Sequence, residues 1–343
     1  MNPPCKFAAA LLWGVAAIAP MLPAPAHADV EKTSLALPAV AFIFSTAYIA
    51  EDAGIFKAVG LEVTQQVITG IASANAVIAG SIDFSFSSGV TLTRAAARQQ
   101  PVIAIAGTYD RTGFWVLISK KIADERHFDP NASLAERAKL LKGLRVGVGA
   151  INAIPHAYLK LIAGLGGLDG EKDIVVAGVT PPEQLGALSR DAIDGVSSGS
   201  PVVEQLQHDG IGVIVANGTT GNNVDPPSLT RIAANVLMTR KQLCADHRSL
   251  CVKMGDAMVK ANAFMHEHPQ EAAAMLGKRL NVKDPEVLAL AYKNTVESTP
   301  SPPLLDEKAL ATADDLNVAA GFMKAEEKLP SYTAIFTNEF VKH

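Results

Sequence analysis

Two halves of this sequence repeat three short motifs in the same order. The pairs are Gly60-Leu61 with Gly167-Leu168, Ile82-Asp83 with Ile193-Asp194, and Ser87-Ser88-Gly89 with Ser197-Ser198-Gly199. The two copies are separated by 107, 111 and 110 residues respectively. Near-equal separations in an unchanged order predict two lobes of like topology. Two such lobes enclose a cleft, and clefts between domains are preferred places for ligand binding.

Strand-like and helix-like segments alternate along most of the chain, which is typical of α/β folds. The predicted strands are Ser34–Leu37, Glu62–Val67, Asp83–Ser87, Val102–Thr108, Phe114–Ser119, Arg145–Val148, Asp173–Val176, Gly195–Ser198, Gly212–Ala216 and Ala234–Thr239. The predicted helices between them are Thr46–Ala53, Ser73–Ala79, Thr91–Arg98, Leu134–Leu140, Pro155–Leu165, Pro181–Leu188 and Pro201–His208. Beyond Gln242 only helices are predicted, at Leu250–His266, Gln270–Leu280, Asp284–Thr295 and Asp306–Met323, before an amphipathic segment, Tyr332–Val341.

Four strand-to-helix turns carry small or hydroxyl side chains. In open α/β sheets, ligands bind beyond the carboxyl ends of the strands, where helix N-termini favour anions and polar acceptors. Ordinary helix capping explains the hydroxyls at any single turn, but four turns placed alike in two similar halves favour a binding site. The candidate residues are Phe42, Phe44, Ser45 and Thr46, then Ser87 and Ser88, then Asn152 and Ala153, and finally Ser198 and Ser200.

The segment from Tyr109 to Gly113 lies between the two halves and is expected to line the hinge. Tyr109 is a candidate to pack against a ligand, although it suits the core of a lobe equally well. Arg111 is a candidate partner for an anionic ligand. A structural ion pair with Asp110 explains Arg111 just as well, because such pairs often have no further role.

The first 28 residues read as a cleaved signal peptide. Lys6 supplies the positive start, residues 7–19 form a short apolar run, and Ala26-His27-Ala28 is a small-x-small cleavage site. The apolar run is shorter than the roughly 20 residues that span a bilayer, which argues against a membrane anchor. We therefore expect a soluble mature protein that begins near Asp29 in an extracytoplasmic compartment.

Cysteine and charge usage fit an exported protein. Cys244 and Cys251 remain after cleavage, and in an oxidising compartment their spacing favours a disulfide over two buried thiols on one helix. The net charge of the whole chain is −4, and no basic stripe is present, so nucleic acid is not an expected partner.

Signals for enzymatic chemistry are missing, and we expect no G-x-S-x-G nucleophile elbow. The sequence contains no H-E-x-x-H motif and no G-x-x-x-x-G-K-[ST] phosphate loop. His266-Glu267-His268 precedes a proline at the end of a predicted helix and fits charge compensation there better than a metal site. We expect no catalytic residue, no metal and no cofactor.

Four segments resemble one known family. They are Ala47–Val63 (AYIAEDAGIFKAVGLEV), Ala76–Phe84 (AVIAGSIDF), Leu141–Val148 (LKGLRVGV) and Ala187–Gly195 (ALSRDAIDG). In order and spacing they resemble the nitrate/sulfonate/taurine-type periplasmic binding proteins of ABC importers, which are related to thiamine-pyrimidine-synthesis-like proteins. The resemblance extends from about Leu35 to Ala216.

The resemblance implies a type II periplasmic binding protein fold, with two hinged lobes and a helical C-terminal part. It implies lobe 1 at residues 29–110 plus about 230–343, lobe 2 at about 111–229, and a monomer that docks on an ABC permease. It also implies ligand contacts from Ser45, Thr46, Ser87, Ser88, Asn152, Ala153, Ser198 and Ser200. The apolar Phe42-Ile43-Phe44 turn departs from the family pattern and favours a small organic anion, a carboxylate or sulfonate, over a bare inorganic ion.

Two alternatives share this fold. A thiamine-pyrimidine-type enzyme would require a cytoplasmic chain with a histidine in the site, which the signal peptide disfavours. A periplasmic sensor subunit is not distinguished from an import component by the sequence.

Overall fold

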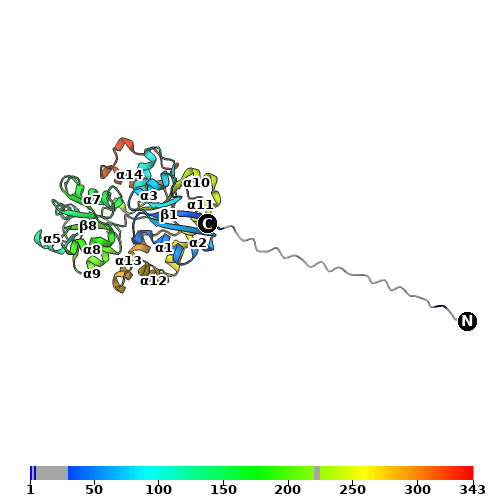
Figure 1. Ribbon diagram of the computed structural model, residues 1–343. Coiled ribbons are helices and arrows are strands. Elements are labelled where there is room, and N and C mark those ends of the chain that lie inside the picture. The colour runs from blue at the N-terminus through cyan, green and yellow to red at the C-terminus, as the bar shows by residue number, and fades with distance from the viewer. Residues whose placement is uncertain (2–3, 5–29, 220–224, 343) are drawn as a thin grey trace.

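Two five-stranded mixed sheets form the framework of the computed structural model, which describes Met1, Pro4 and residues 30–219 and 225–342. Apart from Met1 and Pro4, the predicted signal peptide lies outside these residues. The first sheet has the order β2-β1-β3-β10-β4 and the second β7-β6-β8-β5-β9. Figure 1 shows the two sheets side by side, the first with blue strands and the second with green. The strands of the first sheet are β1 (Glu31–Leu37), β2 (Leu61–Val67), β3 (Phe84–Ser87), β4 (Val102–Tyr109) and β10 (Asn235–Arg240). Those of the second are β5 (Trp115–Ser119), β6 (Arg145–Val148), β7 (Val175–Gly178), β8 (Gly195–Ser198) and β9 (Gly212–Asn217).

The two sheets have the same topology. In each, three neighbouring strands are parallel, and the fourth, β10 or β5, runs antiparallel to its neighbours. The fourth strand is the one that follows a crossover between the sheets: the first crossover joins β4 to β5 and the second joins β9 to β10. All ten predicted strands are present, and the predicted two-lobed α/β fold is confirmed.

The repeated Ile-Asp motif has the same structural role in both lobes. Asp83 accepts a hydrogen bond from the backbone N–H of Ser34 in β1 at 3.1 Å, and Asp194 accepts one from the backbone N–H of Arg145 in β6 at 2.8 Å. Each aspartate therefore pairs the start of its strand with the neighbouring strand. The preceding isoleucines, Ile82 and Ile193, are both buried.

The glycine of each Ser-Ser-Gly motif makes room for a crossover. A Cβ atom on Gly89 would lie 2.6 Å from the carbonyl oxygen of Ala233, in the second crossover. A Cβ atom on Gly199 would lie 2.6 Å from the carbonyl oxygen of Gly113, in the first crossover. Only glycine permits so close a backbone approach.

Helices cover both sheets. Around the first sheet lie α1 (Ser45–Asp52), α2 (Ile55–Ala58), α3 (Ala72–Ile78), α4 (Gly89–Ala97), α10 (Lys241–Asp246), α11 (Arg248–Glu267) and α12 (Pro269–Arg279). Around the second lie α5 (Lys120–Glu125), α6 (Leu134–Lys139), α7 (Ile154–Leu165), α8 (Pro181–Ser189) and α9 (Val202–His208). Short 3₁₀ turns are η1 (Phe42–Phe44), η2 (Pro227–Leu229) and η3 (Ala325–Glu327).

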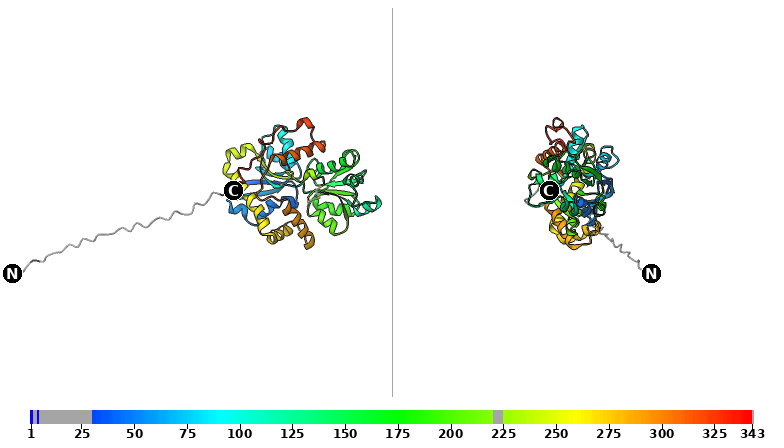
Figure 2. Two further views of the ribbon diagram at one scale, coloured as in Figure 1. Left: turned by 180° about the vertical axis from the view of Figure 1, so that it is seen from behind. Right: turned by 90° about the vertical axis from the view of Figure 1, so that its left-hand side faces the viewer.

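Two C-terminal helices connect the lobes. α13 (Pro285–Glu297) packs against α9 of the second lobe and against η1 of the first. α14 (Glu307–Ala319) packs against α4 of the first lobe and α7 of the second. Figure 1 and the left view of Figure 2 show these orange helices on opposite sides of the junction between the sheets. The lobe boundaries assigned from the sequence stay a prediction, because α13 and α14 contact both lobes.

The C-terminal segment is amphipathic as predicted, with Tyr332 and Ile335 buried and Thr333 and Ala334 exposed. Phe336 forms an isolated parallel bridge to Ala104 of β4, and Phe340 is buried in the core of the first lobe. The last helix ends at Ala319, before a left-handed Gly321, and does not reach Met323 as predicted. Within the described residues, the helices are too short or too polar to cross a membrane.

Cys244 and Cys251 form a disulfide, with their Cα atoms 5.5 Å apart. The alternative of two thiols on one helix does not apply, because Cys244 belongs to α10 and Cys251 to α11.

Candidate functional site

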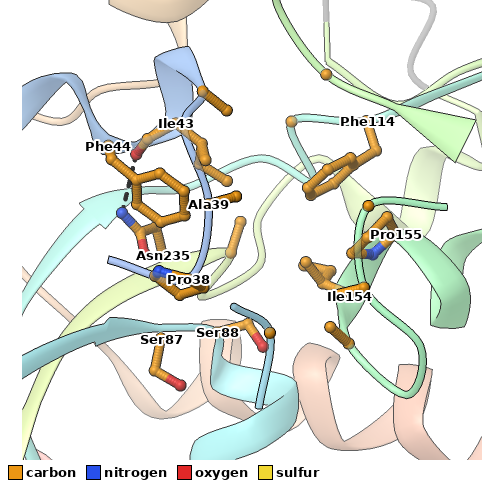
Figure 3. Close-up of a pocket in the computed structure, with 18 of the residues that line it drawn as sticks. Pro38, Ala39, Ile43, Phe44, Ser87, Ser88, Phe114, Ile154, Pro155 and Asn235 are labelled. Atoms are coloured by element: carbon orange, nitrogen blue, oxygen red, sulfur yellow. Dashed lines mark hydrogen bonds between the residues drawn. The ribbon is translucent and has the colours of Figure 1, made fainter. Parts of the chain in front are cut away.

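A cavity of about 90 Å³ lies between the lobes. Both lobes line it, as Figure 3 shows, with Phe44 and Phe114 on opposite sides. From the first lobe come Pro38, Ala39, Ala41, Ile43, Phe44, Gly70, Ile71, Ser73, Ser87, Ser88, Thr91, Tyr109, Ala234 and Asn235. From the first crossover and the second lobe come Gly113, Phe114, Gly149, Ala150, Ala153, Ile154, Pro155, Pro181, Gly199 and Ser200.

Half of the residues predicted from the sequence line this cavity. They are Phe44, Ser87, Ser88, Tyr109, Ala153 and Ser200. They come from all four predicted turns and from the end of β4, so the turns do converge on one site. The structure does not test whether these residues contact a ligand, and that part stays a prediction.

The first turn presents different residues from those expected. Its segment forms the 3₁₀ turn η1, in which Phe42 is fully buried in the core while Ile43 and Phe44 line the cavity. The hydroxyl of Ser45 donates to the carbonyl oxygen of Phe42 at 2.5 Å. The hydroxyl of Thr46 donates to Oδ1 of Asn262 in α11 at 2.8 Å. Phe42, Ser45 and Thr46 therefore fix α1 in place and do not line the cavity.

Three further predicted residues lie elsewhere. Asn152 has a left-handed backbone with a φ of 60°, and its N–H donates to Nδ1 of His156 at 3.1 Å. Ser198 is buried at the end of β8, outside the lining. Arg111 lies in the first crossover, where its charge acts on the carboxylate of Asp110, and it does not line the cavity either.

Sequence reasoning missed Ile43, Ile154 and Asn235 as lining residues. Asn235 begins β10, and its amide donates to the carbonyl oxygen of Ile43 at 2.9 Å and to the hydroxyl of Thr108 at 3.0 Å. It fixes the backbone of η1 beside the cavity. A polar residue at the start of an apolar strand was the available signal for it.

The lobes touch on both sides of the cavity, so the structure is a closed state. On one side the N–H of Phe42 donates to the carbonyl oxygen of Ser200 at 3.2 Å. On the other side Nη2 of Arg94, in α4, donates to the carbonyl oxygen of Asn152 at 2.5 Å. These two bonds join the first lobe to the second.

Burial shifts the pKa values of three titratable groups near the cavity in the direction that favours their neutral forms. Glu204 lies behind Ser200, and burial raises the pKa of its carboxyl group despite hydrogen bonds from Ser200 at 2.6 Å and Asn294 at 2.7 Å. Burial lowers the pKa of His156, whose ring packs against Phe322 with centroids 5.2 Å apart. Burial also raises the pKa of the Tyr109 hydroxyl.

The sequence contains one motif with the spacing of a hydrolase nucleophile elbow. Gly195-Val196-Ser197-Ser198-Gly199 fits G-x-S-x-G, so the expectation that this motif is absent is wrong. Ser197 is fully buried, and its hydroxyl donates to the carbonyl oxygen of Pro155 at 2.8 Å. A nucleophile must instead be accessible and hydrogen-bonded to a base, so this serine is a structural residue.

No cluster of three or more His, Cys, Asp or Glu side chains among the described residues could hold a metal ion. His266 is engaged in the fold: its Nε2 lies 2.8 Å from the carbonyl oxygen of Thr299.

Two lobes of like topology around a cleft, each completed by a strand from a crossover, define the type II periplasmic binding protein fold. The model of the NMT1-like family matches residues 29–280, and the chain belongs to this family. The predicted resemblance to the sulfonate- and nitrate-type binding proteins is confirmed at this level. The sequence matches no curated protein.

Solved structures are similar over most of the chain. A protein from Bordetella bronchiseptica RB50 is 22% identical with a TM-score of 0.80, and the match covers 90% of this chain and 95% of that one. The alkanesulfonate-binding protein SsuA from Xanthomonas axonopodis pv. citri, bound to MOPS, is 14% identical with a TM-score of 0.68, covering 90% and 100%. The nitrate-binding protein NrtA from Synechocystis PCC 6803 is 14% identical with a TM-score of 0.66, covering 91% and 87%. At these identities the likeness shows the fold.

Proposed function

We propose that this protein captures a small organic molecule outside the cytoplasmic membrane and delivers it to the permease of an ABC importer. The cavity between the lobes carries the proposal, because a molecule held there contacts both lobes at once. A ligand that contacts both lobes stabilises the closed state by its differential affinity for that state. The named sulfonate- and nitrate-binding proteins of the same fold support this assignment.

A binding role is favoured over an enzymatic one. The described residues that line the cavity include no histidine, cysteine, lysine, arginine or carboxylate side chain that could serve as a nucleophile or general base. His156 is held away from the cavity by Asn152 and Phe322. We propose a monomer in the periplasm, exported by residues 1–28. Fractionation of cells and N-terminal sequencing of the mature chain would test the export.

Lobe closure gives a direct test of capture. Lys57 of α2 and Lys142, which precedes β6, are exposed residues on different lobes. The double variant K57C/K142C, labelled with a fluorophore pair after refolding to remove carried-over ligand, reports the distance between the lobes. A ligand should raise transfer efficiency and also raise the thermal midpoint, since binding at 100 times Kd adds about 2.7 kcal/mol of stability. A compound that raises the midpoint without changing the transfer efficiency would contradict capture between the lobes.

Transport is tested in cells. Deletion of the gene should abolish uptake of the identified ligand by intact cells. A sensor subunit would instead leave uptake intact and remove only a transcriptional response to the ligand.

A further inference from the structure

The walls of the cavity are apolar and uncharged. Aromatic, isoleucine, proline and alanine side chains make up most of the lining, and none of its described residues carries a charge. Arg94 donates a hydrogen bond across the mouth of the cavity and already has protein partners. Its guanidinium donates to the carbonyl oxygen of Asn152 and lies 5.1 Å from the ring centroid of Phe322. An ionised ligand group would lose its hydration here without gaining an opposite charge.

Helix N-termini around the cavity offer few hydrogen-bond donors. Pro155 and Pro181 lie in the first turns of α7 and α8, and Pro201 immediately precedes α9; proline has no N–H group. At the start of α4, the N–H of Gly89 donates to Ala233 in the second crossover at 2.7 Å. Some of the hydrogen bonds that a helix terminus gives to an anion are therefore removed by proline in α7 and α8 or used within the fold at α4.

Most polar side chains of the lining are also committed to protein partners. Ser73 donates to Gly70 at 2.9 Å and Ser200 to Glu204 at 2.6 Å. The hydroxyls of Ser88 and Thr91 face each other at 3.2 Å, and either can be the donor. Such a hydroxyl pair can offer a proton or a lone pair to a third group, which suits an alcohol, amide or carbonyl.

Burial also disfavours the charged forms of two groups that lie directly behind the lining. Glu204 is buried behind Ser200, and burial favours its protonated form. His156 is buried behind Pro155, and burial favours its neutral form.

Given the proposed capture function, we propose that the ligand is an uncharged organic molecule. Its apolar body lies between Phe44 and Phe114, and its polar group bonds to the hydroxyl pair Ser88–Thr91. This assignment replaces the organic anion expected from the sequence.

Matched compounds test the charge of the ligand. The probes are isobutyramide with isobutyrate, benzamide with benzoate, and 1-butanol with butanesulfonate, titrated at millimolar concentrations into the refolded mature protein at neutral pH. Residue 115 is the only tryptophan after residue 13 and adjoins Phe114, so its emission reports binding. In every pair, the neutral member should bind at least about tenfold tighter, a difference of about 1.4 kcal/mol.

T91V tests the hydroxyl pair, because it removes the hydroxyl while it keeps the shape of the side chain. It should weaken the neutral probes about fivefold, and T312V, a partly exposed threonine of α14 outside the cavity, should leave their affinity unchanged. Equal effects of T91V and T312V would overturn the assignment of the polar subsite.

Two outcomes would overturn the proposal that the ligand is uncharged. In each case, the measurement of lobe closure shows whether the capture function fails as well. If an anion binds more tightly than its neutral partner and raises the transfer efficiency of K57C/K142C, capture stands and the ligand is charged. If no neutral probe binds, the inference is also wrong. In that case the capture function is contradicted as well only if extracts of growth medium also fail to raise the transfer efficiency of labelled K57C/K142C.

Discussion

Closure of the two lobes should depend on Arg94, and the structure gives the size of the effect. The guanidinium donates to the carbonyl oxygen of Asn152 across the mouth of the cleft. A hydrogen bond from a charged group contributes about 1.5–3 kcal/mol when buried, and partial exposure of Arg94 reduces this to about 1–2 kcal/mol. Since 1.4 kcal/mol is a factor of ten, R94A should lower the ratio of closed to open protein about 5- to 30-fold.

Single-molecule transfer efficiency in ligand-free K57C/K142C measures this ratio directly. R98A is the matched control, because Arg98 is exposed and follows the same helix. R94A should also weaken the binding of every ligand, by the factor by which the fraction of closed protein falls, since apparent affinity scales with the fraction of binding-competent protein.

Two results would refute this reasoning. An unchanged distribution of transfer efficiency in R94A would mean that the bond to Asn152 does not hold the lobes together. A loss of affinity confined to anionic ligands would mean that Arg94 contacts the ligand itself, against the uncharged site proposed here.

Three further predictions concern the fold that supports the cleft. The double variant C244A/C251A should lose about 2.5 kcal/mol of unfolding free energy, as expected for a bond that closes a loop with a sequence separation of 7, and reductant should have the same effect on the wild type in urea titrations. G199A should lower the stability by about 1–3 kcal/mol because its Cβ would meet Gly113, whereas G164A, with open space in α7, should leave the thermal midpoint equal or higher. Burial raises the pKa of Glu204, so the unfolded chain releases this proton first and the wild type loses stability as pH rises above about 4.3. E204Q, which keeps an acceptor for Ser200 and Asn294, should therefore gain thermal midpoint over the wild type on going from pH 5 to pH 8, and a constant difference would contradict the raised pKa.

Periodicity was sufficient to predict the framework because strands and long helices bury one face against a core. All ten strands and all the longer helices follow the alternation of apolar residues. Periodicity is a weak signal over four to six residues: α2, α5 and α10 were missed, although α6, which has six residues, was predicted. The C-terminal segment was predicted to be amphipathic, but its contacts could not be predicted, because Phe336 and Phe340 meet strand β4 and the first core, which are distant in sequence.

The candidate site was predicted at the level of turns and not of side chains. Phe42 and Phe44 were both expected at the cleft, but the segment forms a 3₁₀ turn, which has three residues per turn; Phe42 lies in the core, and Ile43 and Phe44 line the cavity. Hydroxyls also have several possible partners. Thr46 found Asn262, 216 residues away, and no local pattern could show this contact.

The crossovers help to explain why this cleft has few free backbone N–H donors, although the fold places helix N-termini around it. Each lobe must admit the backbone of a crossover beside its central strand, and the glycines of the two Ser-Ser-Gly motifs provide that space. In the first lobe the passing carbonyl of Ala233 also takes the N–H of Gly89. In the second lobe Pro201 immediately precedes the corresponding helix, α9, and has no N–H group to offer. The same geometry that builds two hinged lobes thus removes part of the donors that would bind an anion, and the hydroxyl pair Ser88–Thr91 suits an uncharged ligand.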